Sequence, residues 1–426
     1  MSSARIDRRS FLGASAAAGG ALAADMTVLD SLMRPAAAAE LKKKQKSVIL
    51  LWLTGGASQL ETFDPKPGRP TGGPYRAIPT AVPGVHISEL MPKMATRMNH
   101  TAIIRSLNTK IADHGGGSDL MSLGRRDEPS LRYPDLGAVV ARELGSVDSA
   151  VPDYVSFYAQ TEGRGSAVGQ AGFLGARYLP MFLTDKSKPD NLERLAQLSD
   201  LDHAQRADLR DHLSKRFARG RETAVVGSHN QAYARVRGLM SSEKLFDVEQ
   251  ESQKMRDRYG KTQFGEQALV ARRLVEAGVP FVKLGRAWWD SHGENFETHL
   301  ELVSDLDHVM STLIDDLKER GLLENTLIVT LSEFGRTPGI NSSLGRDHFA
   351  SAWSTTLTGC GIKGGAVYGK TDIDGKTVAE GEISAPSLFA TIYEAVGIDT
   401  AKEYHAGPRP VPIIDNFAGA VKEVLA

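Results

Sequence analysis

The sequence predicts an α/β protein built on a parallel sheet. Two observations lead to this prediction. Near-continuous apolar runs at residues 47–53 and 327–331 are typical of strands that are buried on both faces. Amphipathic segments with helical spacing at 265–278 and 302–320 each precede an apolar run, which is the alternation of elements found in such proteins.

The bulk composition limits the size and the partners of the protein. Its 426 residues suit one large α/β domain with insertions, or two domains. A formal net charge of −1 gives no global basic field, so we expect no nucleic-acid partner. The single cysteine, Cys360, excludes an internal disulfide and any cysteine-built metal cluster. No apolar run approaches the roughly 20 residues of a membrane span, and the number of subunits stays open.

The N-terminus carries the pattern of an export signal. Two arginines at positions 8 and 9 precede a weakly apolar run, rich in alanine and glycine, that extends to about Ala24. This pattern is typical of a bacterial twin-arginine signal, so we expect export to the periplasm or cell envelope. The alternative is a disordered arginine-containing tail. We therefore exclude residues 1–40 from the fold and treat 41–426 as a single domain.

The rest of the chain alternates between apolar runs and helical patterns. Further strands are expected at 101–105, 151–158, 279–284 and 354–357, and further helices at 133–144 and 384–396. Residues 190–277 are mostly helical and highly charged, so we interpret them as an inserted helical layer with a solvated face. The segment 359–364 matches GxGxxG, but a strand and a turn are expected after it. The helix that a dinucleotide site requires is therefore missing.

Polar residues gather where the strand at 327–331 ends. Glu333 and Arg336 follow it directly, and Asp347 and His348 stand side by side after a short polar loop. An acid, a glycine and an arginine at the end of a buried strand suggest a site at the carboxyl end of a parallel sheet. Asp and His are suitable ligands for a hard or borderline metal ion. The alternative is a strand, a turn and a surface salt bridge.

Two other predicted strands end in the same residue types. Asp290 and His292 follow the strand at 279–284, and in an extended segment residues i and i+2 can direct both side chains to one centre. His114 follows the strand at 101–105 and precedes a run of three glycines. An isolated Asp-His pair is more often a helix cap or a surface pair, but here the pattern occurs three times.

In combination, these motifs resemble the bacterial family called "domain of unknown function 1501", from about Ser47 to the end of the chain. The motifs are, in order, GGASQLETFDPKPG, DHGGGS, WDSHGENF, SEFGRTP, GRDHF and APSLFATIYEAVGID. That family is similar to the alkaline phosphatase and sulfatase superfamily. The resemblance therefore implies an alkaline phosphatase-like three-layer sandwich. Its mostly parallel central sheet would have helices on both faces and a helical insertion around 190–277.

The resemblance also implies a set of metal ligands at the strand ends. The residues that it suggests are His114, Asp290, His292, Glu333, Asp347 and His348. Glu333 stands where the superfamily has an aspartate ligand, and His114 lies close to the position of its nucleophile. Phe334 stands where a histidine ligand is expected, and Gly55-Gly56 replaces a first-strand aspartate. Two ligands of the superfamily pattern are therefore missing.

The sulfatase nucleophile motif, Cys or Ser ahead of x-Pro-x-Arg, is absent, so a formylglycine sulfatase is not expected. Ser58, Thr109 and Ser118 are the remaining hydroxyl candidates for a nucleophile, and we assign Ser58 as the catalytic candidate. A metal-activated water, with a pKa lowered to about 7, fits better than a covalent step. His, Asp and Glu ligands favour a divalent ion such as Zn, Mn or Fe over Mg or Ca.

Arg336 is the second catalytic candidate, and two roles are open for it. It can hold a phosphate or sulfate oxygen by paired hydrogen bonds, or it can be a buried arginine that pins the loop to a carboxylate.

Two functions follow from these observations. The first is an exported metal-dependent hydrolase of phosphate or sulfate esters, acting on a small-molecule or polysaccharide ester. The second is a non-catalytic binding or scaffold protein at the cell envelope that kept the fold and lost the chemistry. A coordination position open to solvent distinguishes them, because catalytic metal sites keep one and structural sites do not.

Overall fold

The computed structural model describes residues 45–146, 149, 151–157, 169–184, 187–189, 197–220 and 243–426. The fold is that of the compact unit Lys46–Ala426. The predicted export signal at 1–40 lies outside the described residues. Parts of the predicted strand at 151–158 and of the predicted helical insertion, 190–196 and 221–242, also lie outside them.

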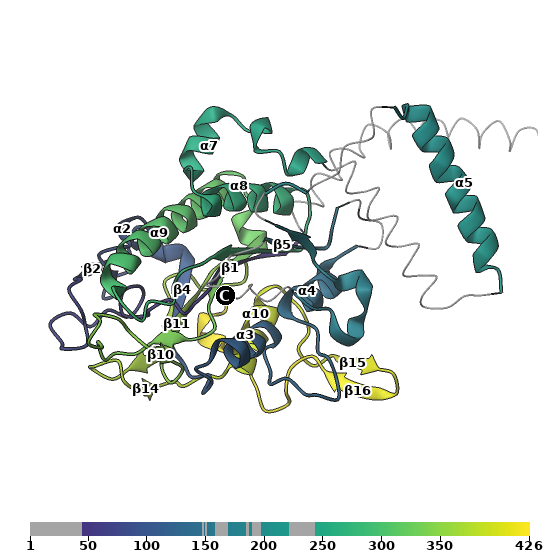
Figure 1. Cartoon of the computed structure of the whole chain (residues 1–426). Helices are drawn as coiled ribbons and strands as arrows, with labels where there is room; N and C mark the ends of the chain where they lie inside the picture. Colours follow the sequence, from purple (N-terminus) through teal and green to yellow (C-terminus); the bar gives the residue numbers. More distant parts are fainter. Residues whose placement is uncertain are drawn as a thin grey trace, which may run out of the picture. The chain divides into compact units, whose positions relative to one another are not determined.

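An eight-stranded sheet forms the centre of this unit, and strands β1, β4, β5 and β11 of it are labelled in Figure 1. The order of the strands is β12-β4-β11-β8-β1-β7-β5-β6. Its strands are β1 (Ser47–Leu53), β4 (Thr101–Leu107), β5 (Tyr154–Phe157), β6 (Met181–Leu183), β7 (Phe281–Arg286), β8 (Thr326–Leu331), β11 (Trp353–Gly359) and β12 (Val367–Tyr368). β1 pairs in parallel with β7 on one side and with β8 on the other. Only β11 runs against its neighbours, β4 and β8. The prediction of an α/β fold with a mostly parallel sheet is confirmed.

The continuous apolar run of β1 is explained by cover on both faces of the sheet. All seven of its residues are buried. Alternate side chains enter different cores: Ile49 and Leu51 pack into one cluster, and Val48 and Leu50 into the other. Because side chains alternate between the faces of a strand, a strand with two buried faces has no place for a polar residue.

Two layers of helices supply this cover (Figure 1). One face is covered by α2 (Pro92–Ala95), α8 (Gln263–Glu276) and α9 (Asn295–Glu319), whose apolar residues join the first cluster. The other face is covered by α3 (His114–Leu123), α4 (Leu136–Leu144) and α10 (Ala385–Ala395), whose apolar residues join the second. α8 lies at the end of the predicted insertion but belongs to the core.

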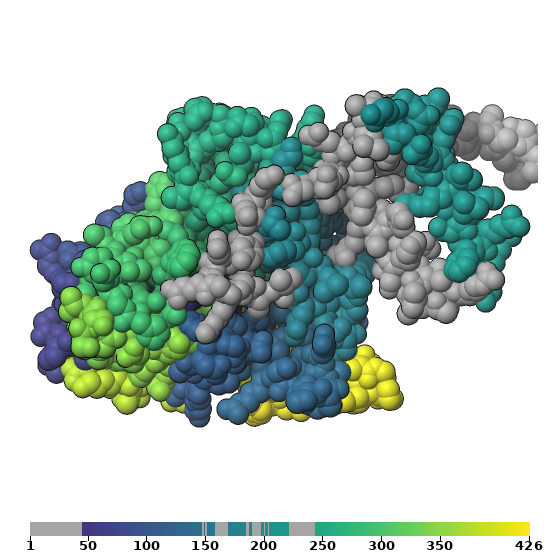
Figure 2. Space-filling model, viewed as in Figure 1, coloured from purple at the N-terminus to yellow at the C-terminus, as the bar shows by residue number. Residues whose placement is uncertain are grey.

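The structure describes further strands and α-helices besides these. They are β2 (Ala77–Pro79), β3 (His86–Ser88), β9 (Gly335–Arg336), β10 (His348–Phe349), β13 (Lys370–Thr371), β14 (Val378–Glu380), β15 (Glu403–Ala406), β16 (Arg409–Pro412), α5 (Asp200–Ala218) and α7 (Gln253–Tyr259). α7 contacts α8 and α9 and forms part of the surface in the space-filling view (Figure 2). Within the described part of the chain, no helix has the length and apolar character needed to span a membrane.

The topology brings distant parts of the sequence to one edge of the sheet. β1, β4, β7 and β8 run in the same direction, so their carboxyl ends lie at the same edge. β11 runs in the opposite direction, so the loop that enters it reaches this edge too. In sheets of this kind, ligands bind outside the carboxyl ends of the strands.

Candidate metal centre

Asp290 is the hub of a cluster of imidazoles at this edge. Its Oδ2 lies 3.1 Å from Nε2 of His114, the first residue of α3. Its Oδ1 lies 3.2 Å from Nε2 of His348 and 3.1 Å from Nε2 of His292. One ligand atom from each of His114, Asp290 and His348 lies within 4.8 Å of the others. With metal–ligand bonds of about 2.0–2.2 Å, one ion can bind to all three.

The outer ring nitrogens of two histidines are fixed by hydrogen-bond acceptors. Nδ1 of His348 lies 2.9 Å from the carbonyl oxygen of Ala112, and Nδ1 of His292 lies 2.8 Å from Oδ1 of Asp347. A carbonyl and a carboxylate only accept, so each Nδ1 carries the proton and donates it. In a neutral ring, Nε2 then presents a lone pair. Metal-binding histidines are commonly oriented in this way.

These lone pairs face one another and the carboxylate of Asp290. The Nε2 atoms of His292 and His348 are 3.0 Å apart, and both approach Asp290 Oδ1. Three acceptors at such distances repel unless positive charge lies among them. That charge is either extra protons on the imidazoles or a cation. The cluster therefore fits a divalent metal ion by its donor types, its spacing and its need for positive charge.

The electrostatics of the cluster are dominated by Asp290. The hydrogen bond with Asp290 raises the pKa of His114 to about 9, and Glu333, 3.9 Å from its Nδ1, adds to the effect. Burial acts to raise the pKa of Asp290, but hydrogen bonds from His114, His348 and Arg336 hold it well below its usual range. Asp290 is therefore an anion at neutral pH. A metal ion would displace the proton of His114, so its binding would release protons.

Arg336 is fully buried beneath the cluster. Its Nε donates to the carbonyl of Gly56 at 2.9 Å, and its Nη2 donates to the carbonyl of Gly55 and to Oδ1 of Asp290. Its Nη1 donates to the carbonyl of Arg346 at 3.0 Å. The geometry thus favours the second of the two roles open for Arg336. It pins the glycine turn and orients Asp290, and it has little exposed surface to offer an oxyanion.

The glycine pair after β1 permits a close approach of three loops. Gly55 and Gly56 have φ angles of +113° and +96°, which favour glycine. A Cβ on Gly55 would lie 2.5 Å from the backbone nitrogen of Asp290, and one on Gly56 would lie 2.9 Å from the ring of Phe334. Without side chains, this turn lets the Gly55 N–H donate to Oε2 of Glu333 at 3.0 Å.

Glu333 and Asp347 lie one step outside the shared centre. Glu333 is buried, accepts from the Gly55 N–H and stands behind Nδ1 of His114. Asp347 is more than half exposed and contacts the outer nitrogen of His292, and this hydrogen bond lowers the pKa of Asp347. The structure thus brings all six predicted ligands into one network, with these two carboxylates supporting histidines.

Ser58 is placed differently. Its side chain is fully buried, its hydroxyl accepts from the Leu60 N–H at 3.3 Å, and its own N–H donates to Nε2 of His299 at 3.1 Å. These contacts face the interior. Phe334, which replaces an expected histidine ligand, packs its ring against His348 with centroids 4.4 Å apart.

The structure also shows supporting residues that the sequence did not suggest. Asn341 donates from Nδ2 to the carbonyl of His292 at 2.9 Å and to Asp347 at 3.3 Å. Glu61 and Arg346 form an ion pair at 2.7 Å in which both side chains are fully buried. These two residues are 285 positions apart, and no local pattern in the sequence links them.

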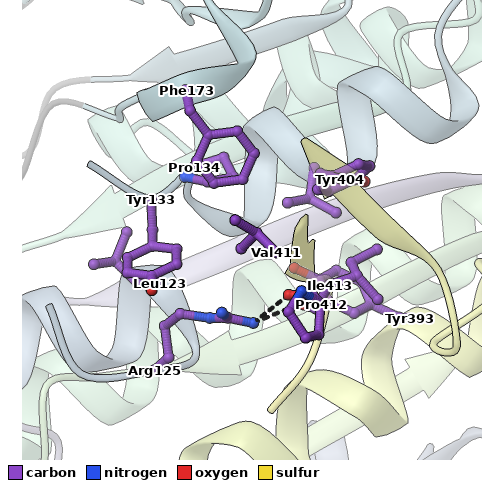
Figure 3. A pocket seen from close by; sticks show the side chains of 11 residues that line it. Leu123, Arg125, Tyr133, Pro134, Phe173, Tyr393, Tyr404, Val411, Pro412 and Ile413 are labelled. Atoms are coloured by element: carbon purple, nitrogen blue, oxygen red, sulfur yellow. Dashed lines mark hydrogen bonds between the residues drawn. The ribbon is translucent and has the colours of Figure 1, made fainter. Parts of the chain in front are cut away.

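A small pocket elsewhere shares no lining residue with the cluster. It lies against the C-terminal hairpin of β15 and β16 and is lined by Tyr133, Phe173, Tyr404 and their neighbours (Figure 3). Arg125 occupies one side of it and donates from Nη2 to the carbonyls of Pro412 and Ile413 at 2.8 and 2.9 Å. Its guanidinium is thus used to hold the hairpin, and the pocket is a packing gap.

Several solved structures are similar to this chain at low sequence identity. The protein Ps i-CgsB matches at 11% identity and a TM-score of 0.41, over 83% of this chain and 73% of that one. The PsFucS1 sulfatase from Pseudoalteromonas sp. matches at 12% and 0.40, over 88% and 70%. A protein in the alkaline phosphatase superfamily from Vibrio parahaemolyticus matches at 10% and 0.33, over 84% and 67%. At such low sequence identity and TM-score, these similarities do not indicate the function of this chain.

Comparison of sequences gives a more definite result. No curated protein matches the chain. The family model described as "Protein of unknown function (DUF1501)" matches residues 45–425. This range includes every residue of the cluster, and the resemblance found in the motifs is confirmed. The chain therefore belongs to the DUF1501 family.

Proposed function

We propose that the protein is a metal-dependent hydrolase of phosphate or sulfate esters that uses an activated water as the nucleophile. The single observation that supports this most is the convergence of three imidazole Nε2 atoms on the carboxylate of Asp290. Two of those imidazoles are already oriented through their outer nitrogens. Side chains that are fixed in this way before a ligand binds are typical of sites that hold the ligand in a defined geometry.

The donor types favour Zn, Mn or Fe over Mg or Ca, because imidazole ligands suit the former and all-oxygen sets suit the latter. A divalent ion bound there would polarise the ester and supply an activated water at neutral pH. His114, Asp290 and His348 would hold the ion, with His292 beside them. Arg336 keeps Asp290 in position through its buried guanidinium.

The exposure of the cluster favours catalysis over a purely structural site. The side chain of His292 is 48% exposed and that of His348 is 22% exposed, so one side of the cluster is open to solvent. Catalytic sites keep such an open position, whereas structural sites are closed. The burial of Ser58, together with its bond to Leu60, favours water over this hydroxyl as the nucleophile.

The rival proposal, a non-catalytic binding or scaffold protein, is favoured by one observation. The ring of Phe334 packs against both His114 and His348, at centroid distances of 5.1 and 4.4 Å. It occupies the place of a further ligand in the superfamily pattern. A metal ion held by the remaining residues would then stabilise the fold by mass action alone.

Metal content and turnover together test the two proposals. Protein purified without a metal-affinity tag is analysed by elemental mass spectrometry and assayed on phosphate and sulfate esters. We expect about one equivalent of a transition metal, lost together with activity in His348→Ala. His405→Ala, an exposed histidine of β15, is the matched control and should keep both. Bound metal without turnover of any ester would favour the scaffold. A folded, metal-free protein that no added ion activates would contradict the hydrolase and would also favour the scaffold.

We also propose export by the twin-arginine route to the periplasm or cell envelope, supported by the pattern at residues 8–24. Replacement of Arg8 and Arg9 by lysine should retain the protein in the cytoplasm, as measured by cell fractionation. Unchanged fractionation of this double variant would contradict the proposal.

A further inference from the structure

Left-handed backbone at non-glycine residues is concentrated around the cluster. Within the described ranges, the non-glycine residues with positive φ are Lys110 (60°), Trp288 (77°), Glu294 (50°) and Leu344 (55°). Each lies within four positions of a cluster residue, and all four are exposed. Bulky residues rarely adopt this conformation. Where the surrounding structure imposes it, the strain is usually found at binding and catalytic sites.

The loops that carry Trp288 and Leu344 are joined beside the cluster. The backbone N–H of Glu294 donates to the carbonyl of Ser343 at 3.1 Å, and that of Asn295 donates to the carbonyl of Leu344 at 3.0 Å. The side chain of Asn341 adds a bond to the carbonyl of His292. The two loops therefore form one continuous rim, and their strained conformations are held by contacts with each other.

Trp288 reaches solvent two residues before Asp290, the hub of the cluster. Trp288, Asp290 and His292 are the solvent-accessible residues of this segment, and Trp288 is 49% exposed. The residues that alternate with them are buried: Ala287, Trp289 and Ser291. Consecutive Cα atoms are about 3.8 Å apart, so the Cα of Trp288 lies within about 7.6 Å of that of Asp290. At this separation an exposed indole is close enough to contact a substrate bound at the cluster.

The chemistry of the rim suits a ring that is apolar on one face and polar at its edge. An indole offers a large flat apolar surface and one N–H donor. The exposed charges of Lys110 and Glu294 on the neighbouring turns are partners for hydroxyl groups. A pyranose ring matches both features, with C–H groups on its face and hydroxyls around its edge. An aryl ring would match the indole but leave the charges without partners.

We propose that Trp288 is the platform on which the alcohol part of the substrate binds, and that this part carries a pyranose ring. The substrate would then be a sugar phosphate or sugar sulfate whose ester group points to the cluster. The inference rests on the proposed hydrolase function for the reaction, but the binding is measurable without turnover.

Tryptophan fluorescence isolates the binding step. The protein has four tryptophans, and three of them are at most 1% exposed: Trp52, Trp289 and Trp353. Quenching by acrylamide therefore reports on Trp288, and Trp288→Phe should remove the accessible component. Glucose 6-phosphate and glucose 6-sulfate are compared with ethyl phosphate, ethyl sulfate and benzyl phosphate, which are also esters of primary alcohols. We expect a glucose ester to protect Trp288 at least several-fold better than the ethyl esters. Equal protection by glucose and ethyl esters, or better protection by benzyl phosphate, would overturn the proposal.

Kinetics distinguish this proposal from the proposed hydrolysis. Trp288→Ala should raise KM for the glucose ester about tenfold, leave KM for the ethyl ester within twofold and keep the metal content. Trp288→Phe should recover most of the loss. Phe417→Ala is the control for loss of an exposed aromatic side chain, since Phe417 is 81% exposed. If the glucose esters protect Trp288 but no ester is hydrolysed, the proposed hydrolase function is wrong and the proposed sugar-binding role of Trp288 stands. If esters are hydrolysed with no preference for a pyranose ring, the proposed role of Trp288 is wrong and the proposed hydrolase function stands.

Discussion

His299 provides a quantitative test of how the interior supports the centre. It is fully buried, and burial lowers its pKa from 6.5 to about 4. The Ser58 N–H donates to its Nε2 at 3.1 Å, so that nitrogen must be unprotonated. Its Nδ1 lies 2.9 Å from the carbonyl of Asn295, which only accepts, so Nδ1 carries the single proton. A second proton, on Nε2, would place two hydrogen-bond donors, this N–H and the Ser58 N–H, against each other. The folded state therefore holds this imidazole neutral.

We expect the free energy of unfolding to fall as the pH is lowered from about 7 to 4. Above the unfolded-state pKa of 6.5, His299 is neutral in both states and contributes no pH dependence. Between 6.5 and 4, the unfolded chain takes up a proton that the folded protein excludes, which favours unfolding. A difference of about 2.5 pKa units, at about 1.4 kcal/mol per unit, gives a loss of about 3 kcal/mol. Below pH 4 this loss levels off.

The assay compares urea unfolding of the wild type and His299→Gln at several pH values between 7.5 and 4.5. Glutamine does not titrate and can accept from the Ser58 N–H, so it removes the titration and keeps an acceptor. The difference in unfolding free energy between the two proteins should shrink or reverse by up to about 2.5 kcal/mol over this pH range. His405→Gln, on an exposed site of β15, should follow the wild type. Parallel curves for the wild type and His299→Gln would refute the reasoning.

Three further substitutions test the support of the centre. Glu61→Ala leaves a fully buried arginine without its carboxylate, so we expect a loss of about 3–5 kcal/mol in the free energy of unfolding, measured by urea titration. Gly55→Ala places a Cβ 2.5 Å from a backbone nitrogen and should destabilise far more than Gly175→Ala, where φ is also strongly positive (+88° against +113°) but the space is open; equal melting temperatures would contradict this. Asp347→Ala removes the acceptor that orients His292 and should weaken metal binding about 10–100-fold in a chelator competition assay, whereas unchanged affinity would show that this hydrogen bond does not support the site.

The sheet was predictable because its strands are covered on both faces. The run at 47–53 has no polar residue after Ser47 until Thr54, and β1 spans the same residues. The site was predictable for a related reason. Polar residues straight after buried strands, such as Asp290 and His114, are carried by the topology to one edge. The strand order cannot be read from the sequence. However, the carboxyl ends of parallel strands always lie at one edge of the sheet, whatever the order.

The starts of elements and the pairing of distant residues were harder to predict. We expected a helix from residue 302, but α9 begins at Asn295. Its N-cap residue, Glu294, is in a left-handed conformation and makes no side-chain cap bond, so the usual start signal is absent. The antiparallel direction of β11 and the buried pair of Glu61 and Arg346 depend on contacts between remote segments, which local periodicity does not encode.

The roles of individual polar residues depended on orientation. Ser58 has a hydroxyl, as a nucleophile requires, yet this hydroxyl is buried and accepts from the Leu60 N–H. Arg336 is a residue type that often binds oxyanions, yet its guanidinium donates its hydrogen bonds to Gly55, Gly56 and Asp290. In both cases the residue type was informative about location but not about which way the side chain points.

The central claim is that the imidazoles and the carboxylate of Asp290 hold a metal ion. Anomalous diffraction from crystals grown with Mn²⁺ or Zn²⁺ tests it most directly. We predict a peak about 2.0–2.3 Å from Nε2 of His114, Nε2 of His348 and a carboxylate oxygen of Asp290. Well-ordered crystals with no peak at this position, in which the Nε2 atoms of His292 and His348 stay 3.0 Å apart, would contradict the claim.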